Sequence, residues 1–534
     1  MYIIVRKCAL KGVFRFENIC YVDFSEEHMK RFTALLITAA VLLLLCSCGK
    51  TEAAREGYVL DRNFVTEGEE NGFSYVTYSD HSEIVACETD EETESIEFPS
   101  TLGGKPVTVI GGSMFMGNVN LKSAVIPHGV TDIGNNVFSG CTELSAVSIP
   151  DTVRRIGCSA FYGTKWYGSL EGEFVTVGDG VLIKYGGKGG NIVIPKNVAY
   201  LSDAFSGNNS IYTVEVPDSV FGISDYAFYR CGSITEIKIP DKMTDIGICI
   251  LEGTTWLEAE EDEFVTIGDG VLIKYGGSDV NVTVPEGIKY IAGAFKGNTD
   301  IESVTLPGSV IDTGDAVFYG CSSLREVCFS GDDTRVGDAA FAECSKLESA
   351  KLPKNLRILG THTFSSCTKL KDVTLPDSVV YIGISAFYNC GMLEQIVLPD
   401  QLKELGSSAF FGCIKLKSIA LPDSTVRIGT AVFSCCYELE SVTLSPAISE
   451  IPNAAFSYCP MLTEIRLGKY IKSVGKYAFE ASAGIKVYVE NDMTVFDGDS
   501  FNECLSVPEI ICGSDSAAGT FAKQKDFTFT LNDR

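Results

Sequence analysis

The sequence predicts an α/β repeat solenoid, a right-handed coil of 23-residue units made mostly of short strands with short helical turns. The main observation is a phenylalanine that recurs every 23 residues over long stretches. The composition, 45% hydrophobic and 21% charged, indicates that the chain has a large folded core. No single unit can bury its apolar residues alone, whereas stacked units share one core. The phenylalanine column comprises Phe115, Phe138, Phe161, Phe205, Phe228, Phe295, Phe318, Phe341, Phe364, Phe387, Phe410, Phe433, Phe456, Phe479 and Phe501, with Leu251 in one place.

Each unit begins with a short strand, and residues 370–390 show its pattern. Leu370, Val373 and Leu375 are expected to point inward, because Val373 and Leu375 alternate with the strand period of two. Pro376 has no backbone N–H to donate, so it ends the strand.

The second half of the unit returns the chain to the core. We expect Gly383 to allow a tight bend, Ala386 to sit where neighbouring coils crowd it, and Phe387 to fill the centre. The same glycine recurs at Gly157, Gly247, Gly314, Gly337, Gly360, Gly406, Gly429 and Gly475.

A second period of ninety residues overlies the first. The segment 138–228 recurs as 228–318, and each copy carries an insert, near 164–190 and 254–280, with Trp166 and Trp256 in matching places. The Gly-Asp-Gly sequence at 178–180, between two apolar runs, predicts a hairpin turn. A tandem duplication is the simplest account.

Both ends depart from the repeat, as the caps of a solenoid should. Two apolar runs near the C-terminus, 510–516 and 527–531, predict a closing pair of strands. The predicted organisation is a polar tether at 48–72, an N-terminal cap at 73–114, the solenoid at 115–500 and a C-terminal cap at 501–534.

The N-terminus predicts an export signal at 29–47. A short basic opening, Met29-Lys30-Arg31, precedes an apolar run from 32 to 45. Fourteen apolar residues suit a signal peptide and fall short of the 18 or more of a spanning helix, so an uncleaved anchor fits poorly. We expect translation to start at Met29 and residues 1–28 to be an upstream extension.

The apolar run ends in Leu45-Cys46-Ser47-Cys48-Gly49, which resembles the bacterial lipobox. The resemblance implies cleavage before Cys48 and a diacylglyceryl thioether on its sulfur. The acyl chains would hold the protein on a membrane, because each buried methylene contributes about 0.8 kcal/mol.

The repeat pattern L-x-x-V-x-L-P-D-S-V-x-x-I-G-x-x-A-F-x-x-C resembles the BspA-type leucine-rich repeat of bacterial and protist surface proteins, over about residues 73–534. The resemblance implies a leucine-rich-repeat scaffold, exported and lipid-anchored at the bacterial cell surface. It further implies binding of host matrix proteins or neighbouring cells.

Ten cysteines form a ladder, each three residues after the phenylalanine column. Other units carry Asn, Thr or Ser in the same place, which indicates a small buried side chain bonded to backbone. Parallel side chains on adjacent coils disfavour the disulfide dihedral, although export favours oxidation and leaves disulfides as the alternative. The absence of a C-x-x-C pair argues against zinc. The ladder comprises Cys141, Cys231, Cys321, Cys344, Cys367, Cys390, Cys413, Cys436, Cys459 and Cys504.

No catalytic motif emerges, so we predict a protein that is not an enzyme and has no cofactor or metal. The four histidines are widely separated, and H-E-x-x-H, G-x-S-x-G and P-loop patterns are absent. Ser366 and Lys369 fit S-x-x-K but straddle a ladder position of an ordinary repeat. The acidic stretch 258–263 could hold Ca²⁺ weakly, but a solvated loop is the stronger interpretation.

The surface predicts the class of partner. A net charge of −27 repels phosphate backbones, which excludes nucleic acid. We expect a monomer that binds extracellular or host proteins, or glycans. The alternatives are a glycan-binding accessory lipoprotein of a polysaccharide-utilisation system and a structural envelope scaffold. The candidate ligand-binding residues are the aromatic residues directly after the phenylalanine column. The alternative is that their rings lie flat over the helical turn and bind nothing. They are Tyr162, Tyr229, Tyr319, Tyr388 and Phe411.

Overall fold

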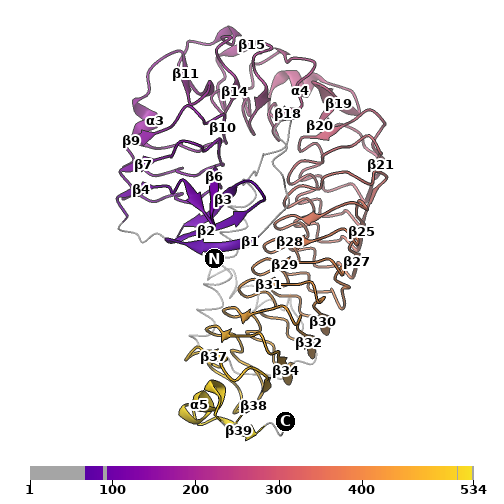
Figure 1. Ribbon diagram of the computed structural model, residues 1–534. Helices are drawn as coiled ribbons and strands as arrows, with labels where there is room; N and C mark the ends of the chain where they lie inside the picture. Colours follow the sequence, from indigo (N-terminus) through magenta and orange to yellow (C-terminus); the bar gives the residue numbers. More distant parts are fainter. Residues whose placement is uncertain (1–65, 88–92, 514, 532–534) are drawn as a thin grey trace, which may run out of the picture. The chain divides into compact units, whose positions relative to one another are not determined.

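The computed structural model describes residues 66–87, 93–513 and 515–531 (Figure 1). The predicted signal, the extension before it and the lipidation residue Cys48 lie outside these ranges. Within them the chain is a solenoid, and most coils contribute a longer strand, a two-residue strand and a turn that carries the column phenylalanine. The predicted fold class is confirmed. No helix in the described part is both long and apolar enough to span a membrane.

The longer strands pair in parallel with the equivalent strands of neighbouring coils. Their middle residues point inward: Val373 is buried between exposed Asp372 and Thr374, as the period of two predicts. These strands are β4 (Ser95–Glu97), β7 (Ser123–Val125), β9 (Ala146–Ser148), β13 (Gly190–Val193), β15 (Ile211–Glu215), β17 (Glu236–Lys238), β21 (Asn281–Thr283), β23 (Ser303–Leu306), β24 (Glu326–Phe329), β25 (Ser349–Lys351), β27 (Asp372–Thr374), β30 (Ser418–Ala420), β32 (Ser441–Thr443), β34 (Glu464–Leu467), β36 (Lys486–Val489) and β38 (Glu509–Cys512).

The two-residue strands form a second set of parallel ladders. In each, the second residue is buried, and the first lies on the other side of the strand, where its exposure ranges from buried Tyr200 to exposed Glu450. They are β8 (Asp132–Ile133), β10 (Arg155–Ile156), β14 (Tyr200–Leu201), β16 (Gly222–Ile223), β18 (Asp245–Ile246), β22 (Tyr290–Ile291), β26 (Ile358–Leu359), β28 (Tyr381–Ile382), β29 (Glu404–Leu405), β31 (Arg427–Ile428), β33 (Glu450–Ile451), β35 (Ser473–Val474) and β37 (Val495–Phe496).

The column phenylalanines stack along the core. Phe364 and Phe387 lie 5.4 Å apart between ring centroids, and Phe387 and Phe410 lie 5.1 Å apart, with nearly parallel planes. All three side chains are fully buried. Offset stacking of this kind adds to the free energy gained by burying the rings.

The recurrent glycine has a different role from the one predicted. Gly383 is not among the residues with positive φ, but a Cβ there would lie 2.7 Å from backbone atoms of Gly360 and Thr361 in the preceding coil. Gly383 therefore permits close approach of coils rather than a left-handed bend, whereas Gly314, in the same column, does have positive φ, at 64°. The left-handed backbone falls instead two residues before the column phenylalanine, where Ser385 has φ 54° and His362 has φ 55°.

The predicted bonding of the ladder cysteines to backbone is confirmed. Each Sγ donates to the carbonyl of the column phenylalanine in the preceding coil, as from Cys367 to Phe341 at 3.0 Å. All cysteines in the described ranges are free. Three ladder positions carry asparagine, each in the coil that follows the N-terminal cap or an insert. There the side-chain Oδ1 accepts a hydrogen bond from a nearby backbone N–H group. These residues are Asn118, Asn208 and Asn298.

We expect the ladder thiols to be unreactive in the folded protein and fully reactive after denaturation without reductant. Burial raises the pKa of Cys231 to about 11 and that of Cys321 to about 12, so the reactive thiolate is scarce at neutral pH. Titration with a water-soluble thiol reagent, native and denatured, measures both states. A denatured count that lacks the ladder thiols would show that they are oxidised.

The two inserts share one construction. In the first, α3 (Lys165–Ser169) starts at the cap Thr164, and a hairpin joins β11 (Phe174–Val177) to β12 (Val181–Tyr185), as predicted. The Lys184 ammonium donates to the carbonyls of Tyr167 and Leu170 at the end of α3, at 2.9 and 2.7 Å. The second insert repeats this with α4 (Thr255–Ala259), β19 (Phe264–Ile267) and β20 (Val271–Tyr275).

The N-terminal cap begins earlier than predicted. Strand β1 (Thr66–Glu70) lies in the segment expected to be a tether, and it pairs antiparallel with β2 (Phe73–Thr77). The cap continues through β3 (Ser82–Cys87), β5 (Thr101–Leu102) and β6 (Lys105–Ile110), and β6 joins the two-residue ladder at β8.

The C-terminal cap contains the predicted strand pair and a helix that the sequence analysis missed. Strand β38 pairs with β39 (Thr528–Leu531) in parallel, and such a pair needs a crossover connection. Helix α5 (Ala517–Gln524) supplies it, with the Ser516 side chain accepting the Gly519 N–H at its start. The Phe521 ring of α5 packs on Phe496 and closes the apolar end of the core.

Candidate functional site

Charged side chains recur on the outer side of the two-residue strands. Each directly precedes a buried residue that points into the core, which is Ile, Leu or Val except for Thr313 after Asp312. Asp312 and Arg335 occupy the equivalent place in isolated bridges. The sequence analysis missed this column, although a charged residue directly before Ile-Gly, with opposite signs one coil apart, was a usable signal. Its charged members are Asp132, Arg155, Asp245, Asp312, Arg335, Glu404, Arg427 and Glu450.

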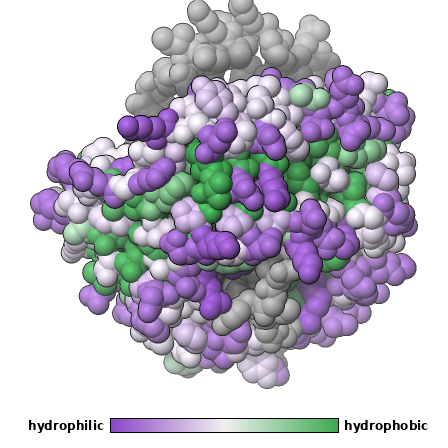
Figure 2. All heavy atoms as spheres, turned by 90° about the horizontal axis from the view of Figure 1, so that it is seen from above, coloured by the Kyte–Doolittle hydropathy of each residue, from purple (hydrophilic) through white to green (hydrophobic). Residues whose placement is uncertain are grey.

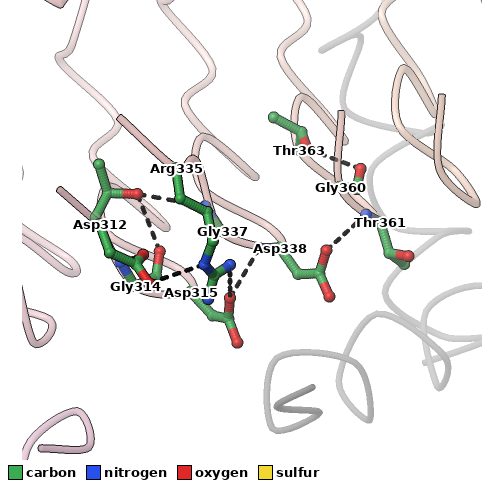
Figure 3. Close-up of polar contacts among 10 residues, drawn as sticks. Asp312, Gly314, Asp315, Arg335, Gly337, Asp338, Gly360, Thr361 and Thr363 are labelled. Carbon is green, nitrogen blue, oxygen red and sulfur yellow. Dashed lines mark hydrogen bonds and ion pairs between the residues drawn. The ribbon is translucent and has the colours of Figure 1, made fainter. Parts of the chain in front are cut away.

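Arg335 is the centre of one cluster (Figure 3). Its Nε donates to Asp312 Oδ2 at 2.8 Å, and Nη1 lies 3.7 Å from Asp315 Oδ1. Asp315 also accepts the Asp338 N–H, and Asp338 accepts the Thr361 N–H, so carboxylates connect three successive coils. Burial disfavours the charged guanidinium, but the two neighbouring carboxylates outweigh it and raise the pKa of Arg335.

Arg155 is the centre of a second, more deeply buried cluster. Its guanidinium lies 3.0 Å from Asp245 and 3.5 Å from Asp132, over the ring of Phe221. The three charged side chains are only 14%, 3% and 12% exposed. Burial raises the pKa of Asp132, and the positive charge of Arg155 opposes that rise.

The Arg155 cluster joins coils that are ninety residues apart. Arg155 is on β10, the last strand of one sheet, and Asp245 is on β18, the last strand of the next sheet, β11-β12-β14-β16-β18. The two side chains nevertheless touch. A second bond spans the same distance, from Asn135 Nδ2 to Asp225 Oδ2 at 3.2 Å. The two-residue ladder is therefore tightly bent at the first insert, and these polar contacts hold the bend.

Arg427 borders a recess of about 330 Å³ on the same side of the coils. Glu404, Ser449 and Glu450 contribute its polar groups, and Val426 contributes an exposed apolar side chain. A guanidinium between carboxylates offers both donors and acceptors for the polar groups of a partner. In the part of the chain that the structure describes, no three His, Cys, Asp or Glu residues are grouped to hold a metal.

The predicted aromatic column does not form a continuous exposed stripe. Tyr162 is 68% exposed, whereas Tyr388 and Phe411 are buried, which corrects the expectation of exposed anchors at those two positions. The rings of Tyr388 and Phe411 stack at 5.0 Å, so each covers the other. Tyr229 and Tyr319 are half-buried; Tyr319 donates to Glu343, and the Arg230 guanidinium lies over Tyr229.

The two weaker motifs remain ordinary parts of the coils. Ser366 has a left-handed backbone at the end of its turn, Lys369 is exposed, and the ladder thiol of Cys367 lies between them. The acidic stretch 258–263 is mostly exposed and follows the start of α4.

The sequence profile of the BspA-type leucine-rich-repeat region matches residues 88–171, 185–262, 266–393 and 380–507, more than half of the chain. The chain belongs to the BspA-type leucine-rich-repeat family. A search among curated proteins finds no match.

Solved structures of bacterial leucine-rich-repeat proteins are similar to this chain. A leucine-rich-repeat protein from Bacteroides ovatus is 19% identical, with 90% of this chain and all of that one covered and a TM-score of 0.32. A leucine-rich cell surface protein from Faecalibacterium prausnitzii is 22% identical over 46% of this chain and 92% of its own, with a TM-score of 0.27. A leucine-rich-repeat protein from T. pallidum is 26% identical over 41% and 86%, with a TM-score of 0.24.

Proposed function

We propose that this protein is a non-catalytic recognition module, lipid-anchored through Cys48 at the bacterial cell surface, which binds extracellular proteins or neighbouring cells. The observation that carries the proposal is the contrast between the two sides of the aligned strands. One inward row across β23, β24, β25 and β27 holds Val, Val, Ala and Val, while the outward row beside it holds Thr, Cys, Lys and Thr. A uniform core under a varied surface suits a scaffold that presents side chains to a partner.

The surface chemistry supports a protein partner. Hydrophilic residues cover most of the face shown in Figure 2, with apolar residues in a band between them. The recess beside Arg427 combines a guanidinium, carboxylates and an exposed valine within one contact area. Such mixed surfaces are typical of transient interfaces, where polar groups give specificity and a few apolar side chains give affinity.

A binding screen of the intact chain tests this function. We expect saturable binding to one or more extracellular-matrix proteins at physiological salt, and no binding to a glycan array. Val426→Glu places a third carboxylate at the rim of the recess and should weaken protein binding about tenfold if that recess is used. Met461→Glu, at an exposed methionine on the turn after the ladder residue Cys459, is the matched control, because it adds a carboxylate outside both the recess and the longer strands.

Each result of the screen decides between functions. Binding only to a glycan would replace the proposal by a glycan-binding accessory role. If neither the matrix proteins nor the glycan array bind, the protein does not recognise soluble partners, and a role as a structural envelope scaffold is favoured.

A further inference from the structure

The first insert creates a polar notch at the surface. It lies between the turn of Phe161 and the coil that follows the insert, and it is lined by Ser159, Tyr162, Tyr167, Ser202 and Asp203 together with apolar side chains. Its enclosed volume is about 20 Å³, and it opens to the surface. A cavity of this size holds a group as large as one water molecule.

Asp203 places a carboxylate in the notch without a cation beside it. Its Oδ2 accepts the backbone N–H of Ser159 at 2.7 Å and the Ser159 hydroxyl at 3.1 Å, and its Oδ1 accepts from Ser202. Burial raises the pKa of Asp203 despite these hydrogen bonds, and no Lys or Arg of the described chain pairs with it. A half-buried carboxylate that has no cation beside it gains from an incoming positive charge.

The hydroxyl groups of Ser159, Ser202 and Tyr167 offer the notch only acceptors. The Ser159 hydroxyl donates to Asp203, the Tyr167 hydroxyl donates to Ile183 O at 3.2 Å, and the single Ser202 hydroxyl hydrogen goes to either Asp203 Oδ1 at 3.2 Å or Gly157 O at 3.3 Å. Each hydroxyl hydrogen is thereby used inside the protein, and the oxygens keep lone pairs. The notch therefore suits a donor, and the adjacent carboxylate favours a cationic one.

Tyr162 adds an aromatic surface at the opening. Its side chain is 68% exposed, and it is the most exposed member of the predicted aromatic column. An exposed ring beside a carboxylate can cover the methylene stem of a lysine and attract its charge.

The duplication provides an internal comparison. Ninety residues on, Ser159, Tyr162 and Asp203 are replaced by Cys249, Glu252 and Gly293. Gly293 has φ 75°, and a Cβ there would lie 3.0 Å from Ile248 Cβ, so an aspartate does not fit the second junction without strain. The carboxylate, the hydroxyl and the aromatic ring occur together only at the first insert.

We propose that this notch is a subsite for a primary ammonium group, the Nζ of a lysine on a protein partner. The proposal rests on the protein-binding function above and names one chemical determinant of the partner. The –NH₃⁺ group is the size of one water, has three donors and no acceptor, and matches a small acceptor-only site. A guanidinium has four heavy atoms in a plane and is too large to enter, so the subsite selects lysine over arginine.

Ligand-detected NMR on the intact chain tests this selectivity. The probes are two capped, otherwise neutral glycine peptides, one with a single lysine and one with a single arginine. We expect the lysine peptide to bind at least about tenfold more tightly. Asp203→Asn keeps a side-chain acceptor for Ser159 but removes the charge, and it should weaken lysine binding about tenfold. Tyr162→Ala changes an exposed residue that folding does not need and should weaken it about threefold.

Glu252→Gln is the matched control, because it removes an exposed carboxylate at the position equivalent to Tyr162. It should leave lysine binding unchanged. Equal binding of the two peptides, or equal behaviour of Asp203→Asn and Glu252→Gln, would overturn the proposal and leave a notch that holds water. Matrix-protein binding without lysine preference would refute the subsite alone, whereas lysine-peptide binding without any protein partner would refute the proposed function alone.

Discussion

Phe387→Ala is expected to destabilise the solenoid by about 4 kcal/mol. The side chain is fully buried and stacks on Phe364 and Phe410 at 5.4 and 5.1 Å, so its removal leaves a cavity between two rings that cannot close over it. The loss combines the transfer free energy of the ring, the cavity and two aromatic contacts. Urea unfolding followed by circular dichroism measures it, with the slope of the transition compared between variants.

Phe387→Leu is the control, since Leu251 occupies the same column in this chain. We expect it to cost less than about 1.5 kcal/mol, because most of the volume is kept. Stacked coils can also unfold in part, so a cavity in the middle of the array should broaden the transition as well as shift it. A loss for Phe387→Ala no larger than that for Phe387→Leu would show that the rings do not hold the coils together.

The repeat, the core and the ladder were predictable because they depend on local spacing. Phe387 and Cys367 each recur at the same position in neighbouring coils. Each is buried because the equivalent residue of the next coil covers it. The hairpin at 178–180 followed from its glycines, which have φ 58° and 80° at Gly178 and Gly180. Each of these inferences needed only neighbours in sequence or one coil away.

The candidate sites were less predictable because they depend on how coils tilt. Arg155 meets Asp245 only because the first insert bends the ladder, and no local pattern encodes that bend. Asp203 likewise reaches back 44 residues to Ser159. Tyr388 and Tyr162 share a column, yet one is buried by Phe411 and the other has no such cover.

Arg155→Ala is expected to destabilise the protein by about 3–5 kcal/mol, because it leaves two carboxylates buried without their cation. Asp245 is 3% exposed and Asp132 12% exposed, and the negative charge of Asp245 already raises the pKa of Asp132. Thermal and urea unfolding at pH 7 measure the loss. Arg325→Ala is the matched control: Arg325 also lies near two carboxylates, Glu302 and Glu348, but it is 49% exposed and should cost less than about 1 kcal/mol.

The pH dependence separates an electrostatic cause from lost packing over Phe221. A carboxyl whose pKa is raised in the folded state binds protons more readily there than in the unfolded chain, so the penalty is present at pH 7 and declines as the pH falls through the folded pKa. The difference in the free energy of unfolding between Arg155→Ala and the parent protein should therefore shrink between pH 7 and pH 4. A difference caused by lost packing would stay constant. A deficit that is independent of pH, or no larger than that of Arg325→Ala, would mean that the bend is held by the apolar core alone and that the Arg155 cluster only lies over it.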